Sequence, residues 1–238
     1  GDLVMTRVYW NGGGVWVRNR QDGQSELEYQ MRNWYYFNWL CGDHINEQHI
    51  HNLDVSNWLL KGYPVECNGM GGREVRNGVD HGQIFDHHFC EYTYDNGVKM
   101  ISQCRHIQDC WSNVSEHAHG TKGYADLSGK IYNSKNELIW KHDGSGDGHQ
   151  VEHYDLFAAL RRGEVPNEGE YGAKSTMTAI LGRNATYSGK VVKWDDAINS
   201  QMALADFDSF TSMDSTAPVQ PDENGRYPVP VPGSTKVV

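Results

Sequence analysis

Residues 42–65 read GDHINEQHIHNLDVSNWLLKGYPV, and this stretch contains the clearest helical pattern in the chain. Gly62 and Pro64 end the pattern, so we predict a helix over residues 44–60. Side chains three and four residues apart share one face of a helix. That spacing places two imidazoles, two carboxylates and an indole in one stripe: His44, Glu47, His51, Asp54 and Trp58.

Strand-like stretches precede and follow this helix. They cover residues 3–10, 65–75, 83–95, 98–106, 113–119, 130–132 and 138–140. Tight turns such as Asp95-Asn96-Gly97 join consecutive strands, which is typical of an antiparallel sheet. Later helices are predicted over residues 150–161, 170–187 and 194–200. We therefore expect an α+β fold, with a large open, mainly antiparallel sheet and helices packed on one face.

The remaining segments indicate how the chain is divided. Residues 11–26 read as a long loop, and residues 28–40 are crowded with aromatic side chains and read as irregular or short helical structure. We expect one domain over residues 1–213. Residues 214–238 contain five of the seven prolines and are predicted to form an extended tail.

The composition excludes several classes of protein. A net charge of −10 argues against nucleic acid as a partner, because no basic stripe offsets the repulsion. No apolar run approaches the roughly 20 residues of a membrane helix, and the chain opens into a strand-like run rather than a signal peptide. The cellular location stays open, since an export signal would precede Gly1. The five cysteines include no C-x-x-C pair, so we predict reduced, partly buried thiols.

The stripe of polar side chains carries the candidate chemistry. A carboxylate beside a histidine fixes its tautomer and raises its pKa, as general acid–base catalysis requires. Three interpretations stay open: a solvated or structural polar face, a metal site formed by His44, Glu47 and His51, or proton transfer by the Glu47–His51 pair. Five other histidines lie on strand-like stretches: His87, His88, His106, His117 and His119. Each is singly more typical of a core or interface, and two or three of them are expected to line the same pocket, but their spacing does not say which.

A glycine-rich run at residues 143–148, DGSGDG, is not a dinucleotide loop. It fails the G-x-G-x-x-G spacing because His149 takes the third glycine position, and its two aspartates would repel a pyrophosphate. We predict a flexible connection there and no cofactor-binding residue in this chain.

Several patches of the sequence resemble the C-terminal domain of the Gfo/Idh/MocA oxidoreductases. The family pattern has a glycine, then an acid four residues before a histidine, then an Asp and a Trp, which correspond to Gly42, Glu47, His51, Asp54 and Trp58. The similarity continues over residues 59–65, 151–160 and 171–183 and covers roughly residues 3–213. There are two departures: Glu47 stands where the family has Asp, and His49 stands where it has Gly.

The resemblance implies a dihydrodipicolinate-reductase-like open sheet, often used in dimers or tetramers, and NAD(P)-linked oxidation or reduction of a sugar or polyol. It implies that His51 and Glu47 assist proton transfer at the substrate hydroxyl. In the family, a lysine of an E-K-P motif in an N-terminal Rossmann domain completes the site. Some members are lyase- or glycosidase-like enzymes that use a transient oxidation.

Neither a Rossmann glycine motif nor an E-K-P motif occurs in the sequence. We therefore expect NAD or NADP to be bound by a Rossmann domain outside this chain, and the chain alone to be inactive. The alternatives are a stand-alone carbohydrate-binding dimerisation module and a metal-dependent sugar lyase or isomerase. We expect a homodimer or homotetramer formed through the sheet face. The predicted substrate contacts are Arg18, Arg32, Trp34, Asp43, His44 and His88.

Overall fold

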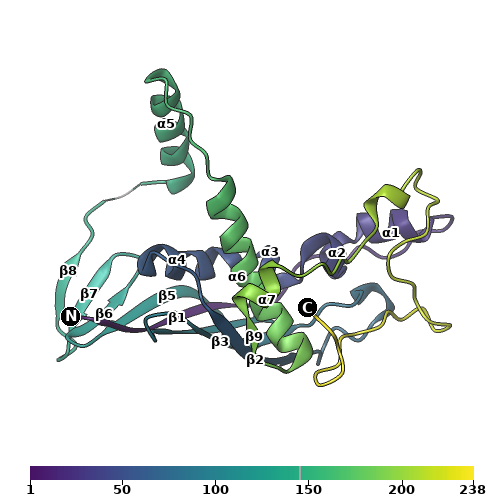
Figure 1. Ribbon diagram of the computed structural model, residues 1–238, viewed down its shortest axis with the longest axis horizontal. Coiled ribbons are helices and arrows are strands. Elements are labelled where there is room, and N and C mark those ends of the chain that lie inside the picture. The colour runs from purple at the N-terminus through teal and green to yellow at the C-terminus, as the bar shows by residue number, and fades with distance from the viewer. Residues whose placement is uncertain (145) are drawn as a thin grey trace.

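One sheet of nine strands forms the base of the molecule (Figure 1). Its order is β8-β7-β6-β5-β1-β4-β3-β2-β9. The strands are β1 Leu3–Gly12, β2 Glu66–Gly72, β3 His87–Thr93, β4 Lys99–His106, β5 Asn113–Gly120, β6 Gly123–Asp126, β7 Lys130–Asn133, β8 Leu138–Lys141 and β9 Val192–Lys193. Neighbouring strands pair antiparallel except β1 and β4, which are parallel. The predicted α+β fold with a mainly antiparallel sheet is confirmed.

The computed structural model describes residues 1–144 and 146–238. The flexible connection predicted over residues 143–148 includes Ser145, and at that residue the prediction lies outside the described part of the chain.

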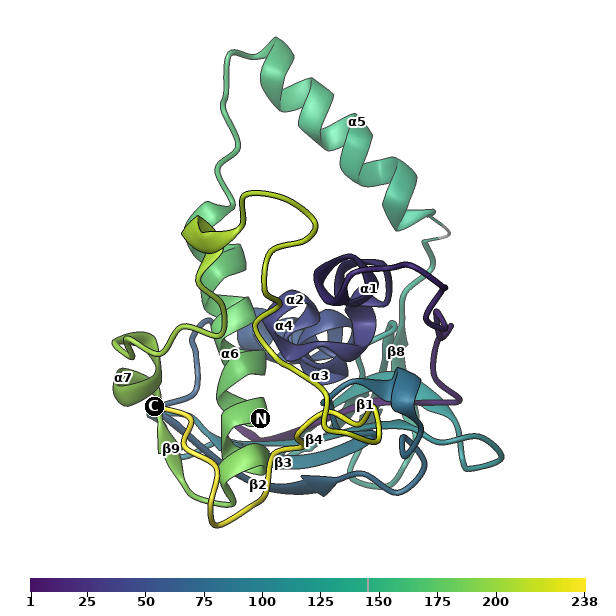
Figure 2. The same cartoon turned by 90° about the vertical axis from the view of Figure 1, so that its right-hand side faces the viewer.

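Helices cover one face of the sheet (Figure 1, Figure 2). They are α1 Glu26–Arg32, α2 Asn38–Cys41, α3 His44–Glu47, α4 Ile50–Leu60, α5 Gly148–Arg161, α6 Gly169–Ser188 and α7 Trp194–Ile198, with 3-10 turns η1 Trp34–Tyr36, η2 Val79–His81 and η3 Phe207–Ser209. Helix α4 packs over β1 and β5, whereas α6 packs over β2 and β3. Helix α5 projects away from the sheet (Figure 1).

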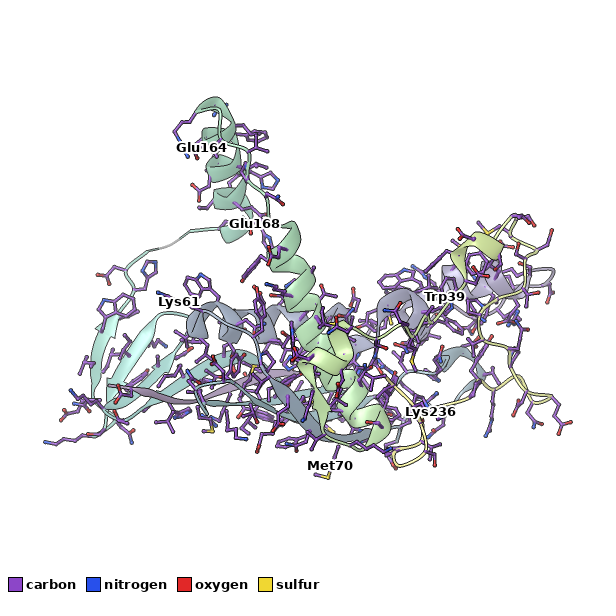
Figure 3. All side chains as sticks on the ribbon, in the orientation of Figure 1. Trp39, Lys61, Met70, Glu164, Glu168 and Lys236 are labelled. Carbon is purple, nitrogen blue, oxygen red and sulfur yellow. The ribbon has the colours of Figure 1, made fainter. Side chains whose placement is uncertain are left out.

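Strand β4 shows why one sheet face is buried. Successive side chains point to opposite faces, and every second one on β4 lies buried under the helices: Met100, Ser102, Cys104 and His106. In the part of the chain that the structure describes, no helix lies on the other face (Figure 1). Met70 on β2 projects from it, away from the helices, and is 74% exposed (Figure 3).

The helix predicted over residues 44–60 is in fact two helices, α3 and α4. The regular helical hydrogen bonding is interrupted at Gln48 and His49, because the backbone N of both residues donates to the carbonyl of His44, at 3.1 Å and 3.2 Å. The next side chain, His49, is fully buried, and its Nε2 lies 2.8 Å from the hydroxyl of Ser102 in β4. This contact joins residues 53 positions apart, so the helical spacing of the sequence holds no signal of it.

The proline-rich residues 214–238 form neither helix nor strand, turn at residues 222–226 and 231–235, and lie against the rest of the chain. The ring of Tyr227 packs edge-on against Phe37, with centroids 4.9 Å apart. Farther along, the Nδ2 of Asn184 in α6 donates to the carbonyl of Val237 at 3.1 Å. All five thiols are free, and four of them are buried. Within the described residues, none of the helices has the length and apolar character needed to cross a membrane.

Candidate functional site

The site begins at a sharp reversal between α2 and α3. Gly42 ends α2 with φ 73°. Asp43 follows with φ 75° and ψ 161°, a backbone region that is essentially restricted to glycine. Asp43 is also fully buried. A non-glycine residue held in this strained conformation indicates that its side chain is needed there.

The carboxylate of Asp43 joins four segments of the chain. Its Oδ1 accepts from the backbone N of His44 at 2.5 Å and from the Nδ1 of the same residue at 2.8 Å. The Nε2 of His88 in β3 lies 3.3 Å from the same oxygen. Oδ2 accepts from the backbone N of Phe85 at 2.9 Å and from the hydroxyl of Tyr187 in α6 at 2.5 Å. Asp43 therefore fixes α3 relative to β3, α6 and the loop before β3.

A column of stacked rings extends from this carboxylate. His44 stacks on His106 with centroids 4.5 Å apart, and His106 stacks on Tyr35 at 6.0 Å. The Nη2 of Arg76 lies 2.6 Å from Nδ1 of His106, and the Oε1 of Gln48 lies 2.9 Å from its Nε2. Because a guanidinium can only donate, Nδ1 of His106 accepts and its Nε2–H donates to Gln48.

Burial sets the protonation of these groups. It lowers the pKa of His44 to about 4 and that of His106 to about 2, because a buried imidazolium loses its hydration. Burial opposes ionisation of Asp43 as well, but the nearby His88 and His44 hold the pKa of that carboxyl well below its usual range. At neutral pH the site therefore contains a buried carboxylate beside the neutral imidazoles of His44 and His106.

Glu47 and His51, predicted as the proton-transfer pair, lie on either side of the break between α3 and α4. Glu47 is partly buried, and its Oε2 has no hydrogen-bond partner within the described residues. Burial raises the pKa of Tyr35, and the neighbouring carboxylate of Glu47 raises it further, both by its charge and as an acceptor for the hydroxyl. The geometry falls short of a hydrogen bond, since the hydroxyl of Tyr35 and the Oε2 of Glu47 are both buried without a partner within the described residues. His51 is exposed, with its ring 6.0 Å from that of Trp10. In the part of the chain that the structure describes, no hydrogen bond joins Glu47 to His51.

The other two members of the stripe do not join this cluster. Asp54 accepts hydrogen bonds from the hydroxyls of Tyr171, at 2.8 Å, and Ser175 and so ties α4 to α6. Trp58 is 71% exposed.

The predicted substrate contacts form two groups. Asp43, His44 and His88 lie together, as described above. Arg18 and Trp34 lie around the ring of Trp16, at 5.0 Å and 5.6 Å respectively. Trp34 also lies 5.5 Å from Tyr35, at the end of the stacked column. Arg32 donates from Nη1 to a backbone carbonyl of the preceding loop at 3.0 Å.

One group of three potential metal ligands is present in the described residues: Asp43, His44 and His88, with ligand atoms within 4.8 Å of one another. The Nη1 of Arg76 lies 3.4 Å from Nδ1 of His44. A divalent cation would have to displace the proton shared with Asp43 and sit beside this guanidinium, so the group fits such a metal poorly. His51, a member of the alternative predicted ligand set, lies outside this group.

Three side chains of the site carry no signal in the sequence: Tyr35, Arg76 and Tyr187. Each lies in a separate segment, and none belongs to a recognisable spacing. The sequence also left open which histidines lie together, and the structure places the rings of His88 and His106 beside that of His44.

No protein-family model and no curated protein matches the chain, but solved structures do. The aldose-aldose oxidoreductase from Caulobacter crescentus, complexed with glycerol, is 14% identical with a TM-score of 0.59, over 81% of this chain and 56% of that one. Levoglucosan dehydrogenase, in complex with NADH and levoglucosan, is 12% identical with a TM-score of 0.59, over 81% and 59%. GenD2 from gentamicin A biosynthesis, in complex with NAD, is 13% identical with a TM-score of 0.56, over 81% and 56%.

At this level of identity the matches show the fold. The chain spans between 56% and 59% of the length of these three structures. These neighbours are oxidoreductases of the Gfo/Idh/MocA type, which agrees with the resemblance found in the sequence. The chain therefore has the fold of the C-terminal domain of Gfo/Idh/MocA-type oxidoreductases.

Proposed function

We propose that this chain is the substrate-binding and oligomerisation domain of an NAD(P)-dependent sugar or polyol oxidoreductase. The observation that carries the proposal is the Oε2 of Glu47, which is buried without a partner among the described residues of this fold. A buried polar atom without a partner costs free energy unless some group supplies one. The hydroxyl of a sugar or polyol is a suitable donor, and the structural neighbours include complexes with glycerol and levoglucosan.

In this proposal Glu47 accepts the proton of the substrate hydroxyl. His51, exposed at the start of α4, exchanges that proton with solvent. NAD(P), when bound, supplies the hydride acceptor for the carbon that bears the hydroxyl. Of the contacts predicted from the sequence, Arg18, Arg32, Trp34, His44 and His88 orient the substrate in this proposal. The carboxylate of Asp43 is fully buried and already accepts from His44, Phe85 and Tyr187, so it supports these contacts and does not bind the substrate.

We also propose that NAD(P) is bound outside this chain, by a Rossmann domain, so that the chain alone is inactive. A dinucleotide site requires parallel strands joined by a crossover helix that follows a glycine-rich turn. Among the described strands, β1 and β4 are the parallel pair. The chain between them passes through α1–α4, β2 and β3, so the connection does not fit that motif.

Two alternatives have less support. A metal-dependent lyase or isomerase would need a cation site, and Arg76 disfavours a cation at the ligand group found here. A stand-alone carbohydrate-binding module would use the same side chains without a cofactor domain, and it predicts the same sugar binding.

The uncovered sheet face supports the oligomeric part of the proposal. Apolar side chains stand exposed on or beside it: Met70 at 74%, Phe89 at 38% and Trp111 at 59%. Exposed apolar patches mark interfaces in soluble proteins. We propose that a second copy of the chain covers this face.

Calorimetry with levoglucosan, myo-inositol, NADH and NADPH tests the function. We expect a polyol to bind and neither dinucleotide to bind. Glu47→Gln should weaken polyol binding about 10- to 100-fold, because a hydrogen bond to a charged group contributes about 1.5–3 kcal/mol. Glu28→Gln, at an exposed position in α1, is the matched control and should bind as the wild type does. Unchanged affinity in Glu47→Gln, or micromolar binding of NADH, would contradict the proposal.

A further inference from the structure

Asp43 combines two features that rarely occur together: a backbone conformation suited to glycine and a carboxylate surrounded by donors. Its φ is 75° and its ψ is 161°. If the position served only the chain reversal, glycine would occupy it without strain. The carboxylate must therefore contribute something that glycine lacks.

One contribution is the placement of α3. This helix has four residues, too few to be stable by itself. The carbonyl of Asp43 accepts from the backbone N of Asn46 and of Glu47, at 2.9 Å each. The side chain of Asp43 contacts β3, α6 and the loop before β3, which fixes the position of the residue. The two backbone hydrogen bonds therefore fix Glu47, one helical turn along, relative to the same elements.

The second contribution is the tautomer of His44. Its Nδ1 lies 2.8 Å from the carboxylate of Asp43, which can only accept, so Nδ1 carries the proton. The Nη1 of Arg76 lies 3.4 Å from the same nitrogen, but it already donates to the carbonyl of Phe85 at 2.6 Å. The shorter contact decides the tautomer. Nε2 of His44 is left as an acceptor, buried and without a partner within the described residues.

We propose that Asp43 is a positioning residue, which sets the start of α3 and the tautomer of His44 so that one helical turn presents two unpaired acceptors, Nε2 of His44 and Oε2 of Glu47. This inference rests on the proposed function and narrows its substrate class. Two acceptors match a ligand with two hydroxyl donors and disfavour one that presents carbonyl oxygens at the same positions. Asp43 acts through His44 and Glu47 and does not itself touch the substrate.

Nitrogen-15 NMR of the imidazole rings tests the tautomer directly. In the wild-type chain at pH 7, His44 should carry its proton on Nδ1. His106 should carry its proton on Nε2, because Arg76 donates to its Nδ1, and this ring serves as an internal reference. A wild-type His44 protonated on Nε2 would overturn the inference, and this measurement needs no variant.

The variant Asp43→Gly removes the carboxylate and keeps a residue suited to the backbone. Without the carboxylate, Nδ1 of His44 can instead accept from the guanidinium of Arg76, so the proton of His44 should move to Nε2. The proton of His106 should stay on its Nε2. Asp86→Asn is the control, since Asp86 is also fully buried and makes no contact with His44, and the amide oxygen of asparagine can still accept from the backbone N of Val75 and of Arg76, at 2.6 Å and 3.1 Å in the wild type. It should leave the tautomer of His44 unchanged. An unchanged tautomer in Asp43→Gly would overturn the inference.

Calorimetry with levoglucosan then separates the inference from the function. Asp43→Gly should bind levoglucosan at least 10-fold more weakly than Asp86→Asn does. Equal affinity in the two variants, with the tautomer changed as expected, would overturn the link to hydroxyl recognition. Failure of the wild type to bind any polyol would instead count against the proposed function, and the NMR result would still decide whether Asp43 positions His44.

Discussion

Replacing Gly182 with alanine probes how closely α6 lies on the sheet. An added Cβ would lie 1.9 Å from the hydroxyl oxygen of Tyr92, 2.8 Å from its Cζ and 3.0 Å from Cδ1 of Ile45. Tyr92 is fully buried in β3, so its ring cannot move aside freely. Alanine is favoured over glycine within a helix by about 1 kcal/mol, whereas overpacking costs about 1–3 kcal/mol or more. Two contacts below 3.0 Å to a buried ring favour the upper end of that range, so we expect a net loss of about 2 kcal/mol.

Gly172 lies on the same helix and is the matched control. An added Cβ there meets nothing within 4 Å, so Gly172→Ala should gain about 0.5–1 kcal/mol. Urea unfolding followed by circular dichroism at one pH measures both changes, and the m-values should stay constant. If Gly182→Ala stabilises the protein as much as Gly172→Ala does, α6 does not pack on β3 as described and the reasoning is refuted.

Three further perturbations test other parts of the structure. Lowering the pH from 7 to 5 should reduce the free energy of unfolding by up to about 2 kcal/mol for each of His44, His49 and His106. The reason is that burial lowers their pKa values to about 4, about 3 and about 2. The unfolded chain takes up protons below about pH 6.5 and the folded chain does not, so a flat profile of urea midpoints against pH would contradict the burial of these rings. Arg76→Met should lower the free energy of unfolding by about 3 kcal/mol, because the carbonyl of Phe85 and the Nδ1 of His106 both lose their donor. A loss below about 1 kcal/mol in the same assay would exclude Arg76 as the donor to these two acceptors. Met70→Asp should shift sedimentation equilibrium toward the monomer at unchanged monomer stability, and an unchanged dimer fraction would remove the open sheet face as the interface.

Much of the fold follows from local patterns in the sequence. Apolar side chains over residues 150–161 predicted a helix that the structure places at Gly148–Arg161, and residues 170–187 predicted one at Gly169–Ser188. Strand β4 over Lys99–His106 was predicted by its alternation and by the preceding turn. These patterns repeat within a few residues, because each element buries one face and exposes the other. Strand β6, four residues long, was missed because it is too short to show an alternation.

The candidate site was only partly predictable. The sequence singled out Asp43 by its proximity to the polar stripe, and His44 and Glu47 because carboxylates and imidazoles rarely share one helical face by chance. It predicted one continuous helix through them, and the structure has two. The break at Gln48 depends on the burial of His49 against β4, and no local spacing encodes that contact.

By itself, the sequence determined the fold class, the helices on one face of the sheet and the segment that carries the polar cluster. Only the tertiary structure decided the state of that cluster. The donors to Asp43 come from residues 44, 85 and 187, and the ring of His88 lies beside the same carboxylate. The conformation and tautomer of the site depend on all of them together. Hydrogen bonds between residues up to 144 positions apart form only after the sheet and α6 have packed, because it is the packing, and not the local chain, that brings their partners within reach.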